Sequence, residues 1–67
     1  MGFTPEQHHA IDECRHHIRE HMKALDSGDK ERIRGTKYAL DMDAIACQIL
    51  GIDPSRITPD GYDEGAK

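Results

Sequence analysis

The spacing of apolar residues divides the chain into two amphipathic segments joined by a short polar turn. Near the start, Thr4, Pro5 and Gln7 form a T-x-x-Q sequence, which is typical of a helix N-cap with a capping box. Apolar residues then recur at intervals of three and four, the spacing of one helix face. We therefore expect a helix over about residues 5–25, with an apolar face made of Ala10, Ile11, Cys14, Ile18, His21, Met22 and Leu25.

A second helix should follow the polar turn. Residues 26–28 read Asp-Ser-Gly, which favours a turn, and Ser27 or Asp29 can cap the next helix. This helix should cover about residues 29–50, because Gly51 suits the left-handed residue after a helix, and Ile52 can then pack back against Cys47. The short connection makes the helices antiparallel neighbours. The predicted fold class is all-α, an antiparallel two-helix hairpin.

The second helix differs from the first in carrying two apolar arcs. One neighbouring helix contacts only part of a helix circumference, so one arc needs another partner. Which arc faces the first helix stays open, although small residues favour the broad arc for close helix packing. The broad arc consists of Gly35, Tyr38, Ala39, Met42, Ile45, Ala46, Ile49 and Leu50, and the narrow arc of Ile33, Leu40, Ala44 and Cys47.

The C-terminal segment offers an alternative cover for the spare arc. Pro54 predicts a helical turn over about residues 54–57, and residues 58–61 read as a β-turn. We expect a hairpin domain over residues 1–59 and a flexible acidic tail over residues 60–67. In a monomer, Ile52 and Ile57 would fold back over the spare arc. Dimerisation of the hairpin into a helical bundle, or a bound partner, is the preferred interpretation, since large apolar patches are rarely left exposed.

Composition narrows the class of protein. The 67 residues include 13 acidic and 9 basic side chains, for a net charge of -4, with one Phe, two Tyr and no Trp. Few cations to neutralise phosphates and few aromatic rings to stack on bases argue against nucleic-acid binding. No apolar run of about 18 residues and no signal peptide is recognisable, so we expect no membrane association. Two cysteines are too few for a secreted disulfide framework, which favours a cytoplasmic setting.

Histidine is unusually concentrated in the first helix, with all five copies between residues 8 and 21. Cys14, His17 and His21 lie along the edge of the apolar face, as candidate zinc ligands. If the turn pairs residue 26 with residue 29, Asp41 lies opposite Cys14 as a fourth ligand. The alternative is that these histidines border the core or face water, with no metal or other cofactor. The same pairing offsets Cys14 from Cys47 by roughly 9 Å along the axis, which disfavours a disulfide.

A basic strip on the second helix suggests another kind of binding. Lys30, Arg34 and Lys37 line one side of that helix, and Arg15 and Arg19 add positive charge from the first helix. Such a strip suits a phosphate-bearing small molecule, a nucleotide or an acidic protein surface. The sequence has no Gly-rich phosphate loop, and a helical hairpin is expected to offer no concave pocket for catalysis. We therefore expect no enzymatic activity.

The preferred interpretation is a non-enzymatic helical binding module that self-associates through one arc of its second helix and binds a macromolecular partner, most naturally a protein. By analogy of size and architecture alone, regulators or inhibitors of the phage-type accessory or adaptor kind belong to this class. Two alternatives remain: a binder or sequesterer of a phosphate-bearing small molecule or nucleotide that uses the basic strip, and a zinc-binding helical protein that uses Cys14, His17 and His21.

Overall fold

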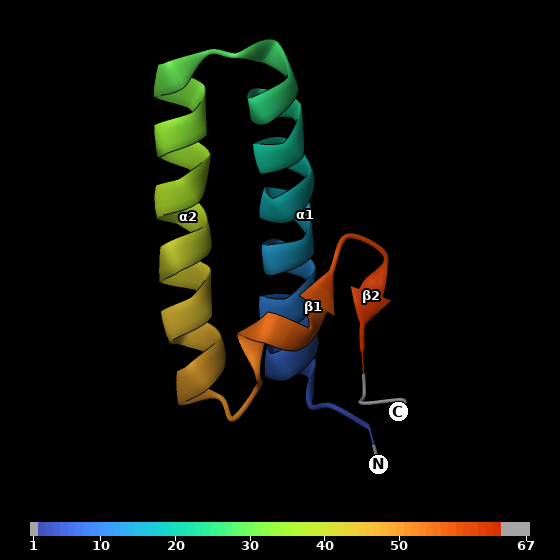
Figure 1. Cartoon of the computed structure of the whole chain (residues 1–67). Coiled ribbons are helices and arrows are strands. Elements are labelled where there is room, and N and C mark those ends of the chain that lie inside the picture. Colours follow the sequence, from blue (N-terminus) through green and yellow to red (C-terminus); the bar gives the residue numbers. More distant parts are fainter. Residues whose placement is uncertain (1, 64–67) are drawn as a thin grey trace.

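The computed structural model describes residues 2–63 and contains an antiparallel pair of long helices. These helices are α1 (Pro5–Ser27) and α2 (Lys30–Ile49). A 3-10 turn, η1 (Pro54–Arg56), leads into a small antiparallel hairpin of β1 (Ile57–Thr58) and β2 (Gly61–Tyr62). Figure 1 shows α1 and α2 side by side, with the β-hairpin crossing α1 near its N-terminal end. The predicted helical hairpin is therefore confirmed, while dimerisation stays a prediction.

The helices begin where the sequence places their caps. The Thr4 side chain accepts a hydrogen bond from the Gln7 backbone N–H at 3.1 Å, and the Gln7 side-chain oxygen accepts one from the Thr4 backbone N–H at 2.9 Å. Asp29 caps α2 by accepting from two backbone N–H groups of its first turn. These bonds satisfy donors that a helix N-terminus otherwise leaves unpaired.

Glycine ends both helices through left-handed backbone conformations. Gly28 has φ 74° at the end of α1, and Gly51 has φ 79° after α2. The Ile52 backbone N–H donates to the Cys47 carbonyl at 2.8 Å, which completes the predicted Schellman ending. This ending turns the chain back, so that Ile52 joins the core beside Cys47.

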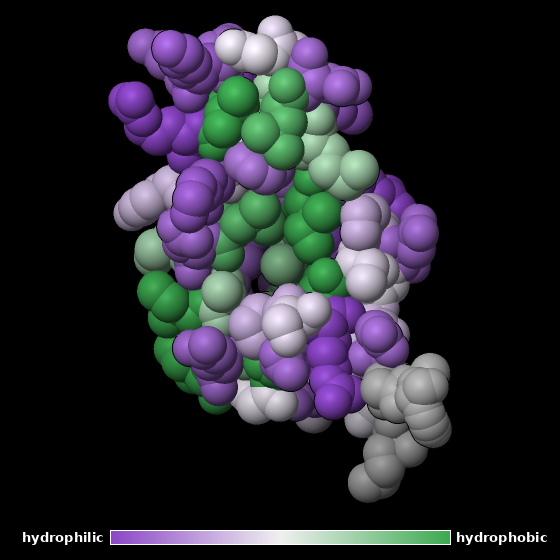
Figure 2. All heavy atoms as spheres, viewed as in Figure 1, coloured by the Kyte–Doolittle hydropathy of each residue, from purple (hydrophilic) through white to green (hydrophobic). Residues whose placement is uncertain are grey.

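The narrow arc of α2 faces α1. Cys47 is fully buried, and Leu40 packs against the same core cluster. Most of the broad arc points outward, although its Leu50 packs against the core cluster. Figure 2 shows hydrophobic surface along the outer edge of the molecule at the C-terminal half of α2. Its large side chains remain exposed to solvent: Tyr38 at 67%, Met42 at 49%, Ile45 at 52% and Ile49 at 79%.

The C-terminal segment folds back onto the hairpin without covering the broad arc. Ile52 and Ile57 are both buried, in one cluster with Ile11, Cys14 and Cys47. The alternative expected from the sequence was a monomer in which these isoleucines fold back over the spare arc. They do fold back, but they do not cover that arc. They close the base of the core between α1 and α2, where β1 and β2 contact α1 and η1 contacts α2. The spare arc still lacks a cover from the residues that the structure describes.

The structure differs from the expected tail at residues 60–63. The predicted turn at residues 58–61 is the loop of the β-hairpin, in which Ile57 pairs with Tyr62 and Thr58 with Gly61. Tyr62 makes an edge-to-face contact with the Phe3 ring, with centroids 5.2 Å apart. This long-range aromatic contact orders residues that look polar and small in sequence. The rest of the expected tail, residues 64–67, lies outside the described residues.

Ile52→Ala tests whether the folded-back segment stabilises the hairpin. Ile52 is buried, so its truncation should lower the free energy of unfolding by about 2–5 kcal/mol, measured by urea denaturation followed by circular dichroism. Leu25→Ala is the control, because Leu25 is 55% exposed and should lose less than about 1 kcal/mol. Equal losses in both variants would contradict the core position of Ile52.

Candidate interaction site

The broad arc of α2 forms a continuous apolar surface beside the hairpin. Gly35 and Ala46 are exposed, and Ala39 and Leu50 are half-buried. These residues form shallow positions on the helix surface next to the large exposed side chains. A Cβ atom built on Gly35 would meet nothing within 4 Å, which means that the space above this glycine is open. The arc therefore combines protruding side chains with shallow positions, as helix–helix interfaces do.

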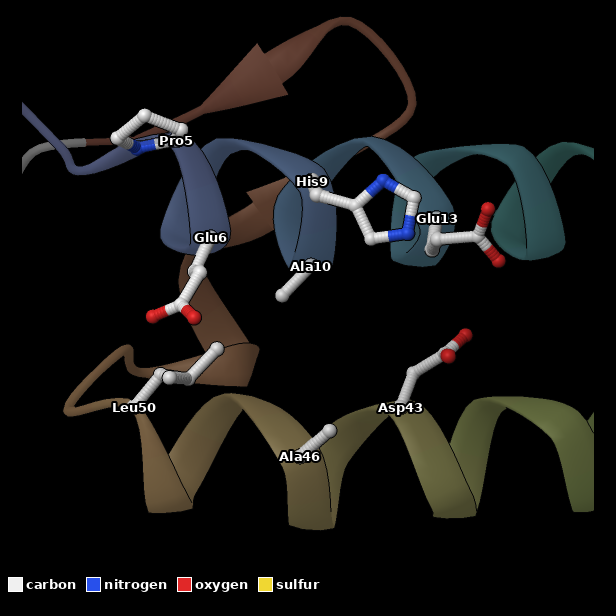
Figure 3. Close-up of a pocket in the computed structure, with 8 residues that line it drawn as sticks. All are labelled: Pro5, Glu6, His9, Ala10, Glu13, Asp43, Ala46 and Leu50. Carbon is white, nitrogen blue, oxygen red and sulfur yellow. The ribbon is translucent and has the colours of Figure 1, made fainter.

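A groove adjoins this arc between the first half of α1 and the second half of α2. Its cavity volume is about 550 Å³. Figure 3 shows Ala10 and Ala46 directed toward one another across the groove, and Asp43 directed from α2 toward α1. The lining residues are Pro5, Glu6, His9, Ala10, Glu13, Asp43, Ala46 and Leu50.

Two of these lining residues, Ala46 and Leu50, also belong to the broad arc, so the groove and the arc form one surface. The hairpin thus has a concave surface, although we expected no concave pocket for catalysis from the sequence. Ala10 and Ala46 face each other across the groove, and their methyl groups are too small to fill the space. Glu6 and Glu13 were not singled out in the sequence, and His9 was counted only among the histidines that border the core or face water. The signal that could have revealed the groove is the small side chain on each helix at the same level.

The candidate zinc ligands form separate contacts with α2. His17 Nδ1 lies 2.6 Å from Asp43 Oδ2, and His21 Nδ1 lies 2.7 Å from the Thr36 hydroxyl. Cys14 is buried in the core instead. Among the described residues, no three His, Cys, Asp or Glu side chains are grouped so that they could hold a metal ion. The histidines thus serve as polar contacts between the helices.

The expected fourth ligand also lies elsewhere. Asp41 is exposed and pairs with Lys37 on its own helix at 3.6 Å, whereas Asp43 is the acid that reaches α1. The helices are therefore offset by a few residues from the pairing that the turn alone suggested. That pairing assumed two ideal helices directly from the turn, and it took no account of the side chains that pack between them.

Both cysteines are free and buried. Burial, with smaller contributions from the negative charges of Asp43 and of an ionised Cys47, raises the pKa of the Cys14 thiol to about 11. Burial also raises the pKa of the Cys47 thiol, with a smaller contribution from Asp43. Both thiols are therefore neutral at physiological pH, and a neutral thiol is a poor nucleophile and a poor metal ligand. They pack as small apolar side chains.

Several residues of the basic strip make contacts with other groups of the chain. Arg19 donates to the Pro59 carbonyl at 2.8 Å, Arg15 lies 3.4 Å from Asp12, and Lys37 pairs with Asp41. Lys30 and Arg34 are exposed and make no ion pair within residues 2–63. Three of the five candidate cations therefore already have partners within the described residues.

No protein-family model, curated protein or solved structure matches this chain. Within the described residues, neither helix is long and apolar enough to cross a membrane. The most prominent surface of the described residues is the broad arc with its adjoining groove.

The raised Cys14 pKa predicts a loss of stability at high pH. An unfolded thiol loses its proton near its ordinary pKa of 9.0, while the folded thiol keeps its proton up to about pH 11. Deprotonation therefore favours the unfolded chain across this interval, and the free energy of unfolding should fall as the pH rises from 9 to 11. Urea denaturation at several pH values, with a phosphine reductant present, measures the effect.

Cys14→Ala is the matched control for this pH dependence. It removes one titrating thiol and should make the decline between pH 9 and 11 shallower, while the contribution of Cys47 remains. Identical declines in the variant and the unaltered chain would show that Cys14 is not buried as described.

Proposed function

We propose that this chain is a non-enzymatic helical binding module, a regulator or inhibitor that self-associates through the broad arc of α2 and engages a macromolecular partner. The observation that carries the proposal is the exposure of Tyr38, Met42, Ile45 and Ile49 on one side of a single helix. A chain of 67 residues has little core to spare, yet it keeps these four large side chains out of that core. Contiguous apolar surface of this kind marks an interaction site.

The energetics support association through this arc. Full burial of one Ile, Leu or Met side chain is worth about 1.5–3 kcal/mol relative to exposure. Ile49 is the most exposed of the large apolar residues and Ile45 lies one turn before it, so a second helix placed here would bury both. Small domains commonly obtain stability from such association.

The groove is the part of this surface that suits a macromolecular partner. Three carboxylates, Glu6, Glu13 and Asp43, surround its apolar floor. This arrangement favours a partner segment with lysine or arginine beside apolar side chains, because opposite charges across an interface guide the encounter and its orientation.

Ile45→Glu tests self-association. Size-exclusion chromatography with light scattering should give twice the chain mass for the unaltered protein, and the chain mass for the variant, because a carboxylate would be buried without a partner. The circular dichroism of the variant should remain helical, since Ile45 is half-exposed in the monomer.

Leu25→Glu is the control for this experiment. Leu25 is 55% exposed but lies on α1, outside the broad arc, so this variant should keep the mass of the unaltered protein. If the unaltered chain is monomeric at every concentration, the proposed self-association is contradicted.

A further inference from the structure

We infer that the partner on the broad arc is a second copy of this chain, docked with its α2 antiparallel to the first α2 and with Met42 at the two-fold axis. This inference rests on the proposed self-association and adds the partner's orientation and register. Dimers of identical chains most often have two-fold symmetry, in which one surface patch contacts its own copy. Met42 lies midway between Gly35 and Ile49, the ends of the exposed arc.

The order of large and small residues supports the antiparallel orientation. With a two-fold axis at residue 42, residue i of one copy lies level with residue 84 − i of the other. Each small residue of the arc then shares its level with a large one, and Met42 shares its level with its own copy. The levels are Gly35 with Ile49, Tyr38 with Ala46, and Ala39 with Ile45.

A parallel pair would place identical residues at the same level. Two Tyr38 side chains would then crowd one layer, while two Gly35 residues would leave another layer nearly empty. Both defects are costly, because protein interfaces pack as densely as interiors and tolerate neither voids nor overfilling. The antiparallel pair keeps the side-chain volume of its layers more even. The open space above Gly35 is available for Ile49 of the second copy.

The charge distribution along α2 gives an independent reason for the same orientation. The first half of the helix is basic, and the second half carries only acidic residues. A parallel pair would stack the basic half of each α2 on the basic half of the other, whereas an antiparallel pair places it beside a half that has no basic residue and an exposed Asp41. Asp43 takes no part in this, because it faces α1 and bonds to His17. Helix dipoles also favour the antiparallel arrangement. The charged residues are Lys30, Glu31, Arg32, Arg34 and Lys37 in the first half, and Asp41 and Asp43 in the second.

The expected dimer is small. A standard protein interface uses about 20–30 residues a side, and one helical arc contributes far fewer. The dimer should therefore dissociate on dilution, and its orientation should be tested at a concentration where light scattering reports twice the chain mass.

Cysteine cross-linking tests the orientation and the register together. In the antiparallel pair, residue 42 lies level with residue 42 of the second copy, while the two copies of residue 35 are separated by about 21 Å along the axis. A disulfide needs Cα atoms within about 7 Å. Met42→Cys should therefore form a covalent dimer in a glutathione redox buffer, and Gly35→Cys should not. The added side chain at residue 35 meets no neighbour in the monomer.

A mixture of Gly35→Cys and Ile49→Cys should give a covalent heterodimer, which mass spectrometry identifies by its peptides. The unaltered chain is the background control, because Cys14 and Cys47 are both buried. Self-linkage of Gly35→Cys would overturn the antiparallel orientation. A dimer in light scattering with no cross-link in any variant would overturn this register while leaving self-association intact, whereas a monomer would remove both.

Discussion

The packing of α2 against α1 determines which other surfaces this molecule has. A helix of this length has apolar residues on more than half of its circumference, but α1 occupies only the side of the narrow arc, where Cys47 is fully buried. The folded-back segment then fills the base of the same interface through Ile52 and Ile57. Once these contacts are made, the outward position of the broad arc follows from helix geometry, because the two arcs point in different directions. The packing of the hairpin therefore leaves that arc exposed.

Polar contacts between the helices hold this arrangement in one register. His17 bonds to Asp43, His21 bonds to Thr36, and the Gln7 side chain donates to the Leu50 carbonyl at 2.9 Å. Apolar side chains such as Leu40 tolerate sliding and rotation, whereas a partly buried hydrogen bond is lost when its partner moves. These two histidines, which look like metal ligands in sequence, thus help to set the relative position of α1 and α2 through their hydrogen bonds. The groove beside Ala10 and Ala46 depends on that position.

Local signals in the sequence predicted the helices well. Thr4 and Asp29 cap them, Gly28 and Gly51 end them, and each of these residues acts through bonds to its near neighbours. The two apolar arcs were equally visible, since periodicity depends only on helix geometry. Their orientation was not, because it depends on which arc gains more by packing against α1. Small side chains at the broad arc suggested close packing there, yet the narrow arc, with Leu40 and Cys47, faces α1.

The groove and the β-hairpin escaped prediction for a related reason. Each depends on residues far apart in the chain, such as Ala10 with Ala46, and no local pattern shows that they meet. The Phe3–Tyr62 contact is the most distant of these, since nearly all of the described chain lies between the two rings. Closing so large a loop costs entropy before any contact repays it. We therefore expect the helices and their turn to form early in folding, and the contact between Phe3 and Tyr62 to form last.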